Sequence, residues 1–122
     1  MIEKKENIVM NKSYAFALRI IKLYKHLLAD QKEYVLSKQV LRSGTSIGAL
    51  VKEAEHAQSK ADFINKMNIA LKEANETEYW LMLLKDSDYL DEKSYISIHS
   101  DSEELIRLLA SIVKSSKESL RK

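Results

Sequence analysis

The chain has 122 residues, and its 20 basic and 18 acidic side chains leave a formal net charge of only +2. It contains no cysteine, which excludes disulfides, thiolate zinc sites and thiol nucleophiles. It has no proline and two glycines, a composition that argues against a turn-rich β-sandwich or barrel. No apolar run reaches the roughly 20 residues of a membrane span, and the polar N-terminus is unlike a signal peptide. We therefore expect one cytoplasmic, all-α domain over residues 1–122, without a membrane contact.

The first predicted helix begins at Asn11 or Ser13, either of which can cap it, and ends near Ala29. Residues 1–10 lack periodicity and are predicted to fray. The apolar residues of this helix cover more than the stripe of roughly 100° that one core contact requires. The excess predicts a second contact surface, with another helix or with another subunit.

The second predicted helix runs from about Tyr34 to His56 and contains both glycines of the chain, Gly44 and Gly48. Residues four apart share one helix face, although each glycine costs about 1 kcal/mol relative to alanine. We interpret the pair as a bare strip of backbone that permits close helix packing, with contact to a ligand as the alternative. The flanking charges exclude a membrane dimerisation motif.

A third helix is predicted over residues 60–85, and a fourth begins at Asp91 or Ser94 and reaches about residue 116. The tail, residues 117–122, is predicted to fray. Four helices joined by short connections predict an antiparallel up-and-down four-helix bundle.

A dense apolar block near the end of the third helix contains Tyr79, Trp80 and Leu83. Aromatic rings of this kind can stack on nucleic-acid bases. Their position in a run of leucines instead favours contacts with the core or with another subunit.

No residue pattern predicts an enzyme. The chain lacks the Gly-x-Ser-x-Gly elbow, a phosphate-binding loop and a dinucleotide glycine pattern. Glu53-x-x-His56 forms one half of a di-iron bundle motif, but His26 and His99 have no glutamate three residues before them. We therefore predict no catalytic residue, no metal and no cofactor.

Basic residues recur at helical spacing in the first two helices, namely Arg19, Lys22, Lys25, Lys38 and Arg42. Outward cations can contact phosphates without reading a sequence. The same pattern also suits an acidic protein partner or an ordinary solvated surface. Because the net charge is only +2, binding to RNA or DNA would need a local basic stripe, or several such stripes brought together by oligomerisation.

Several short motifs follow one another in a fixed order between residues 39 and 84: Gln39-x-x-Arg42, Ser46-Ile47, Glu53-Ala54, Ser59-x-x-Asp62-Phe63-Ile64 and Ala70-Leu71-Lys72-Glu73-Ala74. Their order and spacing resemble the bacterial four-helix-bundle family of 23S ribosomal-RNA intervening-sequence proteins, over about residues 12–118. Many members of that family carry an asparagine after the Ser-Ile pair. This chain has Gly48-Ala49-Leu50 there, so any role of the asparagine does not carry over.

The resemblance implies an antiparallel four-helix bundle that assembles into ring-like homo-oligomers, with pentamers expected. Related accessory variability proteins of diversity-generating retroelements form basic pentamers that bind a reverse transcriptase and nucleic acid, and they support a scaffold role by analogy. We therefore predict a non-enzymatic oligomeric scaffold or adaptor that presents basic helix faces to RNA, to DNA or to a nucleic-acid-processing partner. A protein–protein interaction module without a nucleic-acid role is the alternative, and a metal protein or enzyme built in the bundle core is the third hypothesis.

Overall fold

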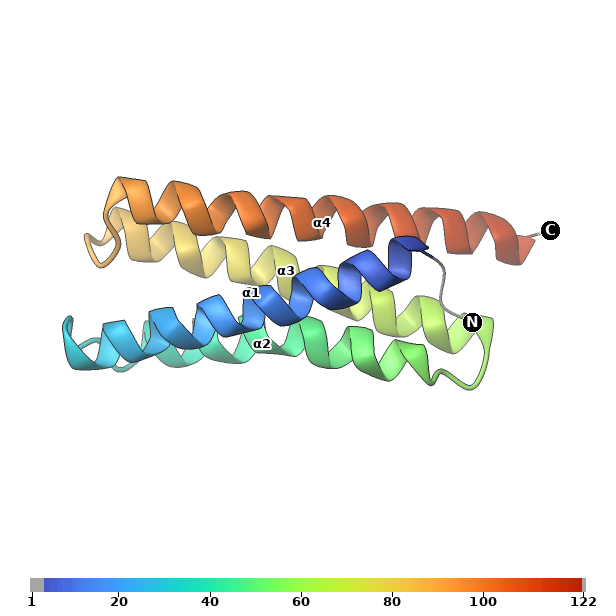
Figure 1. The fold of residues 1–122 in the computed structure, drawn as a ribbon, viewed down its shortest axis with the longest axis horizontal. Helices are drawn as coiled ribbons and strands as arrows, with labels where there is room; N and C mark the ends of the chain where they lie inside the picture. The colour runs from blue at the N-terminus through green and yellow to red at the C-terminus, as the bar shows by residue number, and fades with distance from the viewer. Residues whose placement is uncertain (1–3, 122) are drawn as a thin grey trace.

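A computed structural model describes residues 4–121 of the chain. It contains four α-helices, α1 (Lys4–Ala29), α2 (Leu36–Glu55), α3 (Lys60–Asp86) and α4 (Glu92–Arg121). Figure 1 shows the helices lying along one long axis, with the chain reversing direction between successive helices. The fold is therefore the all-α, up-and-down four-helix bundle that the sequence predicted.

Each helix packs against its neighbours in the sequence, and α4 returns to α1. Within the described residues, the α1 backbone makes no close contact with α3, and α2 makes none with α4. Helix α1 is therefore diagonally opposite α3 in the bundle, and α2 is diagonally opposite α4. The outer faces of α1 and α3 consequently point to opposite sides of the molecule.

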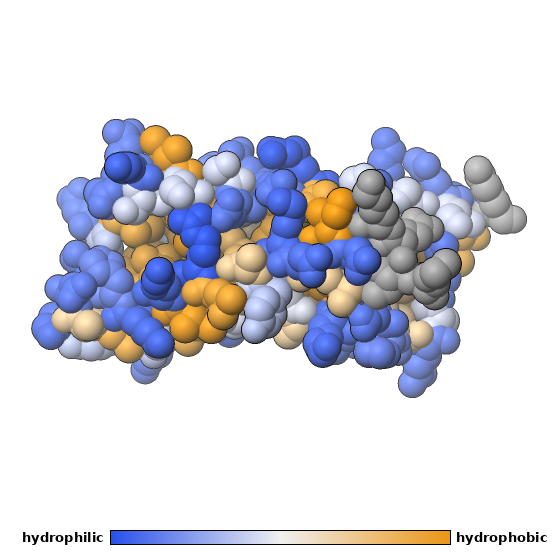
Figure 2. All heavy atoms as spheres, in the orientation of Figure 1, coloured by the Kyte–Doolittle hydropathy of each residue, from blue (hydrophilic) through white to orange (hydrophobic). Residues whose placement is uncertain are grey.

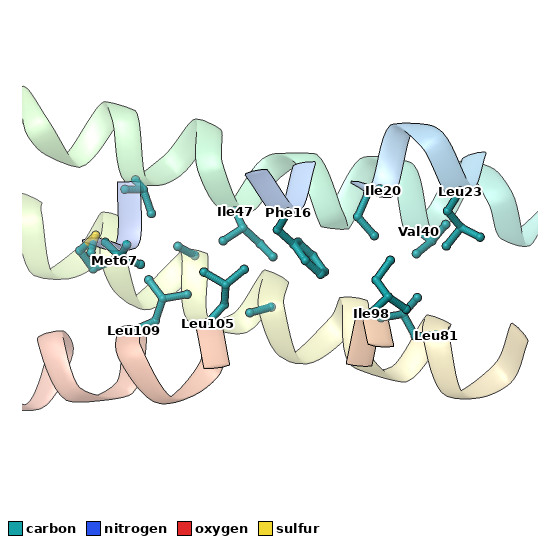
Figure 3. Close-up of a cluster of buried hydrophobic side chains, with 14 of the residues drawn as sticks. Phe16, Ile20, Leu23, Val40, Ile47, Met67, Leu81, Ile98, Leu105 and Leu109 are labelled. Atoms are coloured by element: carbon teal, nitrogen blue, oxygen red, sulfur yellow. The ribbon is translucent and has the colours of Figure 1, made fainter. Parts of the chain in front are cut away.

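All four helices contribute to one hydrophobic core, shown in Figure 3 by side chains that include Phe16, Ile20, Ile47, Leu81 and Leu105. Burying a side chain of this size stabilises a fold by about 1.5–3 kcal/mol. The residues recur at helical spacing on each helix, so the core is the sum of four apolar stripes.

The first and last helices, α1 and α4, are longer than the sequence predicted. Helix α1 begins at Lys4 because Val9, within the segment predicted to fray, is fully buried in the core. Helix α4 continues to Arg121, and Lys60 Nζ donates a 3.0 Å hydrogen bond to Ser119 Oγ in its last turns. Residues 1–3 and 122, which were also predicted to fray, lie outside the described residues.

The start of α2 depends on a side chain from the connection before it. Val35 occupies the N-cap position without a side-chain hydrogen bond. Instead, the Glu33 carboxylate accepts backbone N–H hydrogen bonds from Ser37 at 2.7 Å, Leu36 at 3.0 Å and Val35 at 3.2 Å. Burial of this carboxyl group opposes its charge, but the three donors outweigh it, and the pKa of Glu33 falls below its ordinary value of 4.5.

We expect Glu33→Ala to lower the free energy of unfolding by about 1 kcal/mol at neutral pH, because three N–H groups lose their acceptor. A lowered pKa means that this contribution is present above the unfolded-state pKa and is lost as the pH falls through the folded-state pKa. The difference in the free energy of unfolding between wild type and variant should therefore shrink as the pH falls below 4.5. Denaturant unfolding near neutral pH and at about pH 3 measures both values.

Glu118→Ala is the matched control, because Glu118 is an exposed glutamate of α4. Its stability should follow that of the wild type at both pH values. A Glu33→Ala deficit that persists unchanged in acid would contradict a capping role for the carboxylate.

Candidate interaction surfaces

Two of the five predicted phosphate-binding cations are engaged in ion pairs within the chain. Arg19 of α1 reaches α4, where its Nη1 atom lies 2.6 Å from Asp101 Oδ2. Arg42 of α2 reaches α3, where it pairs with Glu73 at 3.3 Å and also with Glu76. A cation already paired in this way has less charge to offer an external phosphate.

The other three, Lys22, Lys25 and Lys38, are exposed and make no hydrogen bond or ion pair within residues 4–121. Lys22 and Lys25 lie in the last third of α1, and Lys38 lies in the first turn of α2. All three therefore belong to the end of the bundle that holds the α1–α2 connection (Figure 1). We call them the lysine end.

A groove of about 700 Å³ lies where the C-terminal half of α1 faces the turn between α3 and α4, toward the left of Figure 2. Its wall combines Lys22 and His26 with Asp88 and Asp91. A 2.7 Å hydrogen bond from the Ser94 backbone N–H to the Asp91 carboxylate caps α4 and lowers the pKa of Asp91. The groove is thus mixed in charge rather than a basic channel for a phosphate backbone.

An apolar stripe runs along the outside of α1. Tyr14, Leu18 and Ile21 are 68%, 52% and 36% exposed, and their spacing of four and three residues places them on one helix face. A groove of about 380 Å³ beside Tyr14 continues the stripe toward Gly48 and Ala49 of α2. Figure 2 shows apolar side chains interrupting the mainly hydrophilic surface on this side. We call Tyr14, Leu18 and Ile21 the α1 surface.

A second apolar area lies on the outside of α3, where Tyr79 and Met82 are exposed. Trp80 is half-buried against the edge of the core, its Nε1–H donates to Glu76 at 2.9 Å, and its ring meets Tyr79 edge-on at 5.2 Å. Leu83 is also half-buried. We call Tyr79 and Met82 the α3 surface; the exposure of Met82 was not foreseen from the sequence.

The two glycines differ in their surroundings. A methyl group added to Gly44 would lie 2.7 Å from Ile20 Cγ1, whereas one added to Gly48 would lie 3.4 Å from the Ser13 carbonyl oxygen. Neither glycine has a positive φ, so neither is required by the backbone conformation. The close approach of α1 and α2 therefore depends on Gly44, while Gly48 makes an ordinary contact.

The two side chains of the half-motif Glu53-x-x-His56 lie in separate ion pairs, Glu53 with Lys66 at 3.4 Å and His56 with Glu55 at 3.3 Å. The bundle instead brings Glu78 of α3 to His99 of α4, with Nε2 of the imidazole 3.0 Å from the carboxylate. The Glu-x-x-His pattern does not predict this pair, because Glu78 lies on a different helix from His99, 21 positions before it.

None of the four helices within residues 4–121 combines the length and apolarity needed to cross a membrane. No curated protein matches the sequence. The sequence matches the family described as 23S rRNA-intervening sequence protein over residues 5–111.

The chain is also similar to a solved crystal structure, of a protein with unknown function from the S23 ribosomal protein family of Bacteroides thetaiotaomicron VPI-5482. The two sequences are 63% identical, the match covers 90% of this chain and 98% of the other, and the TM-score is 0.89. The family match spans most of the chain and includes all of the motifs between residues 39 and 84. The chain belongs to the 23S rRNA-intervening sequence protein family.

Proposed function

We propose that this protein is a non-enzymatic, homo-oligomeric scaffold whose subunits associate through the α1 surface and the α3 surface. The exposed stripe of Tyr14, Leu18 and Ile21 carries this proposal. Contiguous apolar groups on a soluble protein surface favour association, because contact removes them from water. The stripe is also the excess apolar surface that the sequence of the first helix predicts.

The positions of the two surfaces support a ring. They lie on α1 and α3, the diagonal corners of the bundle, and so face opposite sides. Two different surfaces of one subunit associate head to tail, and this association closes into a ring when the rotation between subunits allows it. The family resemblance implies a pentamer, and a pentameric ring is the assembly that we propose.

Mass measurement in solution tests this assembly directly. Light scattering and sedimentation should give five times the 14.1 kDa of one chain. A monomer at micromolar concentration would contradict the scaffold. A dimer that does not grow with concentration would contradict head-to-tail association, because each dimer would leave one copy of each surface open.

We further propose that the lysine end of each subunit binds the phosphate backbone of RNA or DNA. Lys22, Lys25 and Lys38 are exposed and carry no internal partner within the described chain, which favours this candidate over the paired Arg19 and Arg42. One subunit offers little net charge, but a ring presents several lysine ends at once, and multivalent contacts raise the apparent affinity.

Neutralising the lysine end, by Lys22→Gln, Lys25→Gln and Lys38→Gln together, should weaken binding to both polymers by tenfold or more at low salt. Each lost phosphate contact should reduce the slope of log K against log salt by about 0.7–0.9. Fluorescence anisotropy with single-stranded RNA and duplex DNA, at about 50 and 200 mM salt, measures the affinity and its salt dependence.

The matched control replaces Lys72, Lys114 and Lys117 by glutamine, because these exposed lysines of α3 and α4 lie outside the lysine end. This control makes the same change in charge and should bind almost as the wild type does. If the wild-type ring binds neither polymer at low salt, the scaffold acts through protein partners alone.

A further inference from the structure

A cluster of three potential metal ligands lies where α3 meets α4. Glu78 comes from α3, whereas His99 and Glu103 lie four residues apart on one face of α4. One ligand atom from each side chain lies within 4.8 Å of the others. The His99 and Glu78 side chains are only 22% and 29% exposed, so the centre of the cluster is partly shielded from water.

The two carboxylates occupy opposite sides of the imidazole ring. Glu78 Oε2 lies 3.0 Å from Nε2, and Glu103 Oε1 lies 3.5 Å from Nδ1. A neutral imidazole has one N–H donor and one acceptor nitrogen. It can therefore donate to only one of these carboxylates, and the other nitrogen then faces a negative oxygen without a proton between them.

We propose that a divalent transition-metal cation, with zinc as the best fit, binds between His99 Nε2 and the Glu78 carboxylate. In this arrangement the Nδ1–H group donates to Glu103, which fixes the tautomer and orientation of the ring. A carboxylate on the second nitrogen is the usual partner of a metal-bound histidine. With the ring in this orientation, Glu103 supports the site and does not itself bind the cation.

The distance between the donors suits such an ion. Zinc bonds of about 2.0–2.2 Å to nitrogen and oxygen, at a tetrahedral angle, place the two donors roughly 3.3–3.5 Å apart. The observed separation of 3.0 Å needs to increase by only a few tenths of an ångström. Imidazole with carboxylate favours zinc and its neighbours over calcium and magnesium, which prefer oxygen ligands throughout. Water would complete the coordination.

Tyr95 packs against the imidazole ring, and Lys85 is the nearby basic residue that enters the local charge. The Tyr95 ring stacks on His99 with centroids 5.0 Å apart, and Lys85 Nζ lies 4.8 Å from the Tyr95 centroid. The carboxylates of Glu78 and Glu103, which lie 3.0 and 3.5 Å from the two imidazole nitrogens, outnumber the single amino group of Lys85, so the local charge favours a cation.

The test uses the full-length, metal-stripped protein in its native assembly. Titration with zinc chloride, followed by calorimetry and by elemental analysis after dialysis, should give one zinc per chain. The same zinc concentration should raise the melting temperature, because a ligand that joins α3 to α4 binds only the folded state. Cobalt should bind at the same site and give a visible d–d absorption band.

Replacing a ligand should abolish this binding, whereas replacing the supporting carboxylate should only weaken it. His99→Ala and Glu78→Gln remove the stoichiometric zinc and the rise in melting temperature. Glu103→Ala weakens binding by about 10–100-fold, the usual cost of losing a partner of a metal-bound histidine. Glu78→Gln changes no shape, so it keeps the test valid if His99→Ala fails to fold, which circular dichroism reports.

His26→Ala and His56→Ala are the controls, because these exposed histidines can bind zinc adventitiously. Both variants should retain one zinc per chain. Failure of the wild type to bind stoichiometric zinc overturns the proposal. Loss of the zinc in a control variant, or its retention in His99→Ala, overturns it equally. None of these results depends on the ring or on nucleic-acid binding.

Discussion

Gly44→Ala is expected to destabilise the bundle by up to about 2 kcal/mol, although alanine is the better helix residue. The added methyl group would lie 2.7 Å from Cγ1 and 2.9 Å from Cγ2 of Ile20. Ile20 is fully buried, so it cannot move away without disturbing the core. Overpacking of this kind costs about 1–3 kcal/mol, and the gain in helix propensity, about 1 kcal/mol, offsets part of it.

Gly48→Ala is the matched control for this result. Its added methyl group makes only an ordinary contact of 3.4 Å with the Ser13 carbonyl oxygen. The variant should therefore be neutral, or more stable by up to about 1 kcal/mol. Denaturant unfolding at one fixed protein concentration compares the two glycines without a contribution from assembly.

A double-mutant cycle shows whether Ile20 causes the effect. On an Ile20→Ala background the clash is absent, so Gly44→Ala should become neutral or stabilising there. Two results would contradict the claim that the close approach of α1 and α2 depends on Gly44. One is equal destabilisation by Gly44→Ala on both backgrounds, and the other is a Gly44→Ala variant that behaves as Gly48→Ala does.

Leu18→Lys is expected to convert the proposed ring into monomers. Leu18 lies in the middle of the α1 surface and is 52% exposed in the single subunit. A lysine there remains solvated in the monomer, so the stability of the subunit itself should change little. In the assembled interface the same charge would be buried without a partner, which costs several kcal/mol per interface. Light scattering should report a mass near 14.1 kDa.

Leu120→Lys is the control, because Leu120 of α4 is 54% exposed and lies outside both apolar surfaces. This variant should assemble as the wild type does. Assembly that survives Leu18→Lys, or that is lost in both variants, would contradict association through the α1 surface.

A mixing experiment distinguishes head-to-tail from symmetric association. Met82→Lys blocks the α3 surface in the same way that Leu18→Lys blocks the α1 surface. Each variant alone should be monomeric if the α1 surface of one subunit binds the α3 surface of the next. An equimolar mixture retains one intact pair of surfaces and should stop at a heterodimer. If each surface binds its own copy, each variant alone would form dimers through its intact surface.

The fold was predictable because its signals are local. Apolar spacing of three and four residues predicted each helix, and short connections predicted the antiparallel order. The ends were less predictable, because Val9 holds the start of α1 through a contact with the core and Glu33 caps α2 from the preceding connection. The apolar spacing around Val9 and around Glu33 does not predict these contacts.

The all-α class, the four-helix bundle and the family follow from the amino-acid sequence alone, since helical periodicity and the order of motifs lie along the chain. The packing of the helices in three dimensions sets which cations are paired, because Arg19 and its partner Asp101 are 82 positions apart in the chain. The same packing places Glu78 opposite His99, and the outside of α1 diagonally from the outside of α3. These relations join different helices, and the packing of the core sets the register between helices.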